Sequence, residues 1–380
     1  MTRQSILEYA ATVRPRYATA GRSEKSAILD EVCRVTGYHR KAAIRLLRRS
    51  PARPAATPRG RPRQYDLAIV PVLVTIWEAS DRLCSKRLAP FLPDLVDALE
   101  RHGELTLPVE VRAQLMQLSP ATIDRLLAPT RQRQRRQPIT QSAASAALKA
   151  LVPVRTFGEW TDLTPGSCQA DLVFHCGEQT AGFHLTTLVM IDVASGWTEC
   201  RAVWGKGQQR VGGAIHAVHQ RLPFPLRELH TDNGGEFVNN GLYPWCQRNG
   251  IRFTRGRPYK KNDQAYVEQR NWLVVRRLVG YDRYSSQQAY TQLTVLYALL
   301  RLYLNFFQPL RKVSSKVRDG ARVTTRYDRA QTPYQRLLVS GALTPDAQAQ
   351  LTETYQQVNP VELKTQIDRA LETLWTLMDS

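Results

Sequence analysis

The sequence is short of acidic residues and has neither a long apolar run nor an apolar start. Its 33 Asp and Glu residues stand against 53 Lys and Arg, which gives a formal net charge of +20. Because so large a surplus of one sign would otherwise only repel itself, it indicates a polyanionic partner. Charge alone leaves DNA, RNA and an anionic membrane open. No apolar run of about 18 residues is present to span a bilayer, and the first residues lack the apolar core of a signal peptide. We therefore expect a soluble, cytoplasmic chain.

Paired cysteines are also missing. The six cysteines are scattered along the chain, and no two of them have Cys-x-x-Cys spacing. This pattern argues against a disulfide framework and fits reduced thiols inside a cell. The N-terminal region offers only Cys33, His39, Cys84 and His102 as zinc ligands, without the spacing that structural zinc sites use. We expect no structural zinc site.

A chain of 380 residues is long enough for two or three domains. Residues 24–49 have the pattern of two amphipathic helices around a tight turn at 36–39. The second helix is basic on its outer side, which predicts a helix-turn-helix module over residues 1–50 that inserts this helix into a DNA major groove. An ordinary helical hairpin with a solvated basic face is the alternative. The basic residues are Lys41, Arg45, Arg48 and Arg49.

Residues 51–65 form a proline-rich basic segment, which predicts an extended linker. Its centre, Pro58-Arg59-Gly60-Arg61-Pro62, matches the AT-hook motif. Arginines on a narrow extended backbone can enter an A·T-rich minor groove, where the negative potential is strongest. We predict DNA contacts for Arg59, Arg61 and Arg63, with a plain basic linker as the alternative.

Residues 66–130 predict a second helical DNA-binding module, because apolar residues recur there at helical spacing. Ser119 followed by Pro120 is a sound helix start, and Arg125 on that helix is a further candidate DNA contact. Residues 131–164 begin with a basic run and continue as an Ala- and Ser-rich stretch. This second linker has no apolar side to fold upon, which predicts a phosphate-binding or merely solvated segment.

From Gln169 the apolar period becomes that of a sheet. Three successive strands joined by short turns, followed by alternating helices and strands, are the element order of an RNase H-like α/β fold with a mixed five-stranded sheet. We place this core at residues 165–310, and a basic, mostly helical region at 311–380. The expected core elements are strands at 169–176, 182–192, 197–204, 226–232 and 251–254, and helices at 208–222, through Trp245 and at 262–278.

Three acids stand where a two-metal phosphoryl-transfer enzyme needs them. Asp171 lies inside a predicted strand, Asp232 at the end of another, and Glu268 on the helix that follows a Pro-Tyr-Lys-Lys turn, with 35 residues between Asp232 and Glu268. Together with the surrounding Asp-Leu-Val-Phe-His-Cys-Gly and Arg-Pro-Tyr-Lys-Lys-Asn-Asp, this set resembles the DDE integrases and transposases. It resembles most the integrase-type transposases of bacterial insertion sequences, whose catalytic core is like that of retroviral integrases.

The resemblance implies that Asp171, Asp232 and Glu268 are catalytic as ligands of two Mg²⁺ ions, for which Mn²⁺ would substitute. The residues themselves support a hard cation, because a carboxylate among the apolar neighbours of Asp171 is costly without one. The resemblance further implies that the helix bearing Glu268 carries groups that hold DNA phosphates. These are Lys260, Lys261, Arg270 and Asn271.

We predict structural roles for the remaining polar residues near these motifs. Acids at strand ends and in first helical turns are usually caps or solvated groups, and a histidine within a strand is more often a satisfied core residue than a ligand. We assign such roles to Asp192, Glu199, Glu236, Asp263, His175 and His230.

We therefore expect a transposase that binds the ends of an insertion sequence in double-stranded DNA, cleaves to free 3′-hydroxyls and joins them to target DNA by transesterification. Because two DNA ends must be held together, we expect a homodimer or tetramer on DNA, associated with the nucleoid when bound. Two alternatives remain: an RNase H-like metal-dependent nuclease, and a catalytically silent, transposase-derived DNA-binding regulator.

Overall fold

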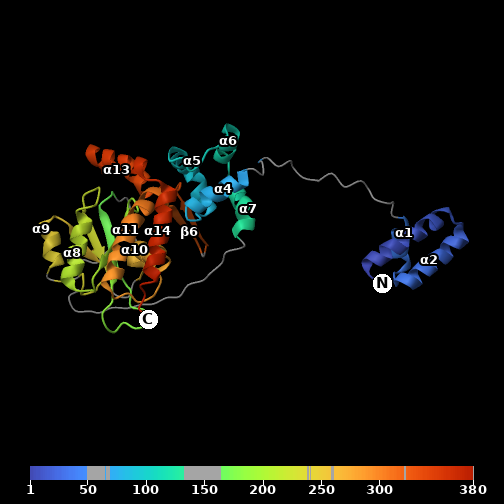
Figure 1. Ribbon diagram of the computed structural model, residues 1–380, viewed down its shortest axis with the longest axis horizontal. Coiled ribbons are helices and arrows are strands. Elements are labelled where there is room, and N and C mark those ends of the chain that lie inside the picture. The colour runs from blue at the N-terminus through green and yellow to red at the C-terminus, as the bar shows by residue number, and fades with distance from the viewer. Residues whose placement is uncertain are drawn as a thin grey trace. The chain divides into compact units, whose positions relative to one another are not determined.

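The computed structural model describes residues 1–48, 65, 69–131, 164–237, 239, 241–257, 261–320 and 322–379. The chain divides into two compact units, Met1–Gln64 and Tyr65–Ser380 (Figure 1). Each unit has its own hydrophobic core. The arginines predicted to contact DNA at positions 49, 59, 61 and 63 lie outside the described residues.

The first unit contains three helices, α1 (Arg3–Thr19), α2 (Arg22–Thr36) and α3 (Arg40–Arg48). The last two are the predicted pair. Gly37 ends α2 with a φ of 72°, a conformation that glycine adopts without strain. Apolar residues of all three helices, among them Ala10, Val32 and Leu47, form one small core. The opposite side of α3 is left to solvent.

The second unit is built on a five-stranded mixed sheet in the order β3-β2-β1-β4-β5. β1 pairs with β2, and β2 with β3, in antiparallel fashion, whereas β4 is parallel to both β1 and β5. This order and these directions are those of the predicted RNase H-like fold. The strands are β1 (Ser167–Phe174), β2 (Thr186–Asp192), β3 (Thr198–Val203), β4 (Glu228–Thr231) and β5 (Arg252–Arg255).

Helices gather around the sheet (Figure 1). They are α8 (Gln208–His219), α9 (Leu242–Arg248), α10 (Ala265–Arg270) and α11 (Gln287–Phe307). Among the described residues no helix combines the length and apolarity needed to cross a bilayer. The helix predicted over 262–278 is present as a continuous helical segment, but it is not a uniform α-helix. A 3-10 turn at Lys261–Gln264 precedes α10, and a π-helical turn at Asn271–Arg276 follows it.

Four helices between the two predicted linkers belong to the same core as the sheet: α4 (Ile69–Ala79), α5 (Ser85–Arg101), α6 (Val109–Met116) and α7 (Pro120–Arg131). Polar contacts reinforce this packing. The Tyr303 hydroxyl on α11 donates to the Ala79 carbonyl at 2.8 Å, and the Gln308 amide donates to the Ser80 carbonyl at 2.9 Å. The segment predicted as a second module over 66–130 therefore shares its core with the sheet domain.

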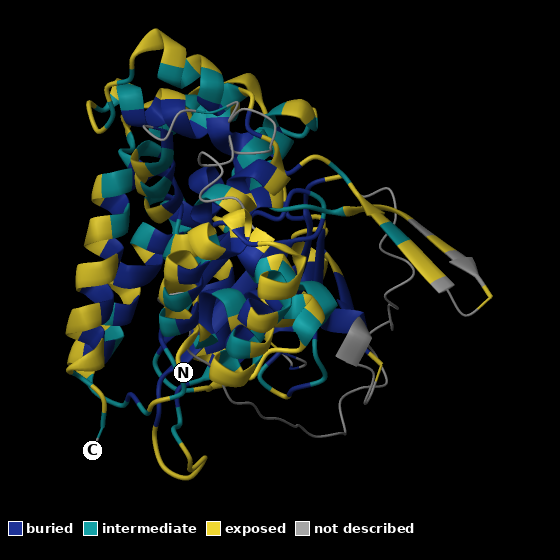
Figure 2. Cartoon of the chain, turned by 90° about the vertical axis from the view of Figure 1, so that its right-hand side faces the viewer, coloured by how far each residue is buried: buried dark blue, intermediate teal, exposed yellow. Residues whose placement is uncertain are grey.

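The C-terminal region consists of a two-stranded hairpin, β6 (Val313–Asp319) and β7 (Arg322–Tyr327), and three helices. The helices are α12 (Pro333–Val339), α13 (Pro345–Gln357) and α14 (Pro360–Trp375). Each begins with a Thr or Asn cap followed by proline, a strong start signal. The apolar residues of α14, among them Leu363, Ile367, Leu371 and Leu374, are buried in the core. The hairpin is largely exposed (Figure 2).

Candidate active site

Asp171 lies in the middle of β1, next to the end of β4. In the parallel register of these strands Ala170 is opposite Thr231. The next residue of each strand segment is an aspartate, Asp171 after Ala170 and Asp232 after Thr231, so the two aspartates are neighbours across the strands. The half-buried Asp171 carboxylate accepts one hydrogen bond from the Leu172 amide at 2.8 Å and another from the Asn271 side chain at 2.6 Å. Both donors hold the carboxylate in place from inside the protein.

Asp232 stands at the turn that follows β4. Its carboxylate accepts a hydrogen bond from the Gly234 amide at 2.8 Å. The next residue, Asn233, donates to the Gly256 carbonyl and accepts from Arg255, both at 2.8 Å. These contacts tie the ends of β4 and β5 together and fix the turn that presents Asp232.

The two aspartates are in electrostatic conflict. Burial, and then the charge of Asp232, raise the pKa of Asp171 to about 7, although the hydrogen bonds from Leu172 and Asn271 act in the other direction. Glu268 contributes a smaller upward effect. A buried carboxylate beside a second one is satisfied by a cation, and a donor set made of carboxylate oxygens suits a hard divalent metal. Asp171 and Asp232 could therefore supply two of the carboxylate ligands of a divalent metal ion.

Glu268 does not join them in the observed conformation. Its side chain on α10 is exposed, and among the described residues no three His, Cys, Asp or Glu side chains come close enough to share an ion. The reason is the way α10 is anchored. The Val267 side chain is fully buried and its amide donates to Gln169 of β1, and the next residue on an α-helix points about 100° further round. The predicted three-acid cluster is thus assembled for its two aspartates only.

Gln169 connects the strand of Asp171 to the helix of Glu268, and sequence reasoning missed it. Its fully buried amide donates to the Asp263 carbonyl at 3.1 Å and accepts from the Val267 amide at 3.1 Å. Asp263 is itself held by two contacts from the Arg257 guanidinium, at 2.8 and 2.9 Å. The signal in the sequence is a polar side chain two residues before Asp171, on the same face of an apolar strand.

Two residues predicted to bind DNA have other roles. Arg270 is only 7% exposed and donates to the Gly196 carbonyl at 3.4 Å, and burial lowers its pKa to about 10. Its guanidinium therefore points into the protein, which corrects the prediction. The Asn271 amide is engaged with Asp171. Position 260 lies outside the described residues, and so does the side chain of Lys261.

The other predicted DNA contacts that the structure describes are exposed. Lys41, Arg45 and Arg48 point to solvent from α3, and Arg125 does so from α7. Exposure permits contact with DNA but does not test it, so these four remain predictions.

The acids assigned structural roles are largely paired. Asp192 accepts hydrogen bonds from the Gly166 amide and from both the amide and hydroxyl of Ser195. Glu199 is 1% exposed and accepts from Arg301 at 2.6 Å. The histidines are core residues: His175 contacts the Thr187 hydroxyl at 2.7 Å, and His230 contacts Thr254 at 3.0 Å.

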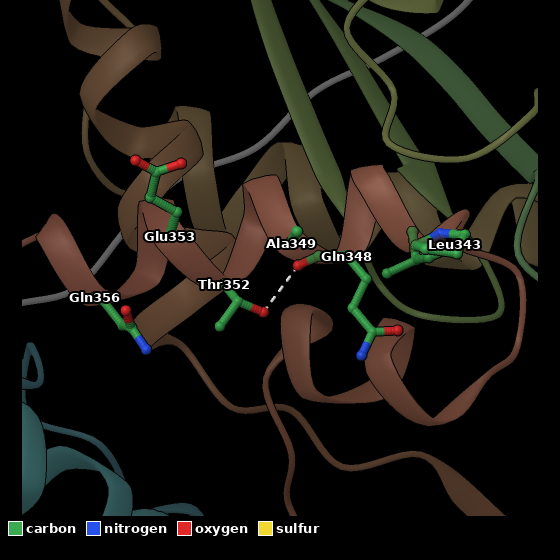
Figure 3. Close-up of a pocket in the computed structure, with 7 residues that line it drawn as sticks. Leu343, Gln348, Ala349, Thr352, Glu353 and Gln356 are labelled. Atoms are coloured by element: carbon green, nitrogen blue, oxygen red, sulfur yellow. Dashed lines mark hydrogen bonds between the residues drawn. The ribbon is translucent and has the colours of Figure 1, made fainter.

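A hollow of about 550 Å³ lies elsewhere, along α13. Its lining includes Gln348, Thr352, Glu353 and Gln356 of this one helix, and Figure 3 shows Glu353 pointing to the other side of the helix from the remaining three. None of the three candidate catalytic acids lines it. The hollow is therefore separate from the candidate active site.

Comparison with known proteins places the chain in a family. The family described as "Integrase core domain" matches residues 164–261, a span that includes Asp171 and Asp232 and ends before Glu268. The uncharacterized protein y4rM of Sinorhizobium fredii is 44% identical over 339 residues, which cover 88% of this chain and 95% of that protein. The catalytic core domain of BIV integrase matches in structure with a TM-score of 0.29 and 20% identity, over 46% of this chain and 93% of that one. The chain belongs to the same family as y4rM and carries an integrase core of the integrase and transposase type.

Proposed function

We propose that the protein is the transposase of an insertion sequence, which cleaves DNA at 3′ ends and joins them to a target by metal-dependent transesterification. The observation that carries this proposal is the pair of carboxylates where the middle of β1 adjoins the end of β4. One sits within the sheet with its pKa raised to about 7 by burial and by the other. Such a pair is suited to bind a divalent cation, and it lies within the span that the integrase core family matches.

Asp171 and Asp232 would hold the metal, with Glu268 completing the site once its side chain turns toward them. When bound, two Mg²⁺ ions supply an activated water or DNA 3′-hydroxyl and stabilise the leaving oxygen. The chain's own groups set the geometry. Asn271 orients the Asp171 carboxylate, the Gly234 amide orients that of Asp232, and Gln169 fixes the base of α10 against β1.

Double-stranded DNA is the proposed substrate, both as the ends of the element and as the target. The net charge of +20 supports a phosphate-rich partner. The exposed basic side of α3 in a separate helical unit supports an end-binding role for the first 48 residues. Joining two ends requires more than one active site, so we propose a dimer or tetramer on DNA.

The test is a cleavage and joining assay with the full chain, supercoiled plasmid and labelled duplexes carrying the flanking DNA, in Mg²⁺ or Mn²⁺. Asp232→Asn removes one charge from the proposed site. Asp368→Asn removes one from the exposed surface of α14 and is the matched control. We expect nicking and joining by the wild type and by the control, and neither by Asp232→Asn. Activity in Asp232→Asn equal to wild type would overturn the proposal.

A catalytically silent DNA-binding regulator is the second candidate, because among the described residues Glu268 and the two aspartates do not form one metal-binding group. Calorimetric titration with Mn²⁺ separates the two. A transposase binds the ion in a manner that Asp171→Asn and Glu268→Gln each weaken. A regulator binds DNA, and its response to Mn²⁺ does not depend on Glu268.

A further inference from the structure

A second basic site lies at the root of the β6–β7 hairpin. A hollow of about 290 Å³ opens there, where the segments flanking the hairpin meet the first turns of α5 and α7. Three cations line it, Lys86 from α5 and Arg311 and Arg329 from either side of the hairpin, together with Pro90, Pro120 and Asp328. None of these residues belongs to the candidate active site.

The charges of this hollow are not neutralised by the protein. Within the described residues no ion pair involves Lys86, Arg311 or Arg329, whereas the neighbouring cation Arg336 is paired with Asp328. Asp328, the acid of the hollow, is already engaged. It binds the Arg336 guanidinium at 2.7 Å and accepts from the Lys312 amide at 2.7 Å. The net charge that faces the hollow is therefore positive.

Two of the three cations are held in place by interactions that leave their charge available. The Arg311 guanidinium lies over the Tyr327 ring, 4.8 Å from its centre. The Arg329 guanidinium donates to the Pro90 carbonyl at 3.2 Å. Fixed guanidiniums that lack an acid partner are the donors that recognise phosphate in a defined geometry.

The hairpin extends the same surface outward (Figure 2). Val317 on β6 is 61% exposed and Tyr327 on β7 is 48% exposed, so the strands are not covered by the rest of the unit. The segment from 311 to 329 carries seven Lys and Arg against two Asp. A two-stranded ribbon has the width that a DNA major groove admits, and a ribbon in a groove brings its root next to the flanking phosphates.

We infer that the hollow formed by Lys86, Arg311 and Arg329 binds backbone phosphates of duplex DNA, and so seats the β6–β7 hairpin on the duplex. The inference rests on the proposed function in one respect, that DNA is the partner. It adds a DNA-binding surface to the sheet domain itself, independent of α3 and of the three acids.

The salt dependence of DNA binding tests it. The full chain is titrated onto a labelled duplex in EDTA at several salt concentrations, so that no metal or catalysis is involved. The test protein is the double variant Lys86→Gln, Arg329→Gln. The matched control is Arg248→Gln, Arg369→Gln, which removes two exposed cations from α9 and α14. Thermal melting establishes that both are folded.

We expect the slope of log affinity against log salt to become shallower by about 0.9 for each backbone phosphate that the test protein no longer neutralises, and to stay at the wild-type value in the control. An unchanged slope in the test protein, or an equal change in both, overturns the inference while leaving the proposed transposase intact. Absence of duplex binding by the wild type would overturn both. Charge reversal, Lys86→Glu with Arg329→Glu, should weaken binding further than the Gln variants, and failure to do so also counts against the site.

Discussion

The Gln169 side chain accepts a hydrogen bond from the amide of Val267 at 3.1 Å, one residue before Glu268 and across 98 positions of sequence. The same side chain donates to the Asp263 carbonyl at 3.1 Å. Two candidate metal ligands, Asp171 on the strand and Glu268 on the helix, are therefore related in space through one buried amide.

Replacing Gln169 should lower the catalytic rate of the folded protein as well as its stability. Gln169→Met keeps the volume but leaves the Val267 amide and the Asp263 carbonyl unsatisfied, at a cost of about 1–3 kcal/mol for each. Because a displacement of about 1 Å in an active site lowers rates roughly 10²-fold, we expect DNA cleavage per folded molecule to fall by about that factor, in kcat rather than KM.

The matched control is Gln292→Met. The Gln292 amide on α11 donates to the Ala370 carbonyl at 2.9 Å, so it also joins two elements, but α11 and α14 carry none of the three acids. Its loss should lower the melting temperature and leave cleavage per folded molecule near the wild-type value. Equal losses of cleavage in both variants would show that Gln169 acts on stability alone.

His175 should make the protein less stable in mild acid. Burial, aided by the charge of Arg276, lowers its pKa to about 3 in the folded state, against about 6.5 in an unfolded chain. Between these values the unfolded state binds a proton that the folded state does not, so stability falls as pH falls below about 6.5, by about 1.4 kcal/mol per pH unit. Denaturant unfolding at pH 7, 6 and 5 measures this slope. His175→Gln should flatten it, whereas His39→Gln at an exposed position should not.

Substitution of Arg270 should affect thermal stability, whereas substitution of the exposed cations of α3 should affect the salt dependence of DNA binding. Arg270→Met removes a buried guanidinium that donates to the Gly196 carbonyl, so it should change thermal stability and leave the salt slope of DNA binding at the wild-type value. The triple variant Lys41→Gln, Arg45→Gln, Arg48→Gln changes exposed cations and should flatten that slope by about 0.9 per phosphate involved. Anisotropy titrations in EDTA measure both. A shallower slope in Arg270→Met would restore its predicted role in DNA binding.

Glu199 should matter for stability alone. Its 1% exposed carboxylate accepts from Arg301 at 2.6 Å and from the Trp197 indole at 2.9 Å. Glu199→Gln removes the charge of a buried carboxylate that faces the half-buried Arg301 guanidinium, and breaking such a pair costs about 3–5 kcal/mol. Lys364→Gln breaks the more exposed pair with Asp368 and should cost about 0–1 kcal/mol. Chemical denaturation compares the two, and near-equal losses would contradict the structural role of Glu199.

Local patterns in the sequence predict the features that are determined by residues close together in the chain, such as strands, helix starts and turns. The alternation of apolar and polar residues around Asp171 predicts a strand, and the glycines after Asp232 predict where another strand ends. The order of strands and helices along the chain predicts the mixed five-stranded sheet. The helix start at Ser119-Pro120 and the turn at Gly37 are local as well.

The errors concern interactions between distant segments. The inward direction of Arg270 follows from how α10 packs. The π-helical turn after it changes the hydrogen-bond pattern of a helix that apolar spacing alone predicts as uniformly α-helical. The partner of Asn271 is 100 positions away. None of these has a signature within a few residues, because each is fixed when strand and helix meet.

The two hydrophobic cores place different limits on which parts of the protein can be exchanged. Helices α1–α3 enclose apolar residues of their own, so this unit could be exchanged as a whole without opening the other core. Under the proposed function, such an exchange would redirect the protein to other DNA ends. Helices α4–α7 share buried residues with the sheet, α11 and α14. Any new specificity there must arise from surface substitutions such as those around Arg125, since exchange of the whole segment would expose the interior of the sheet domain.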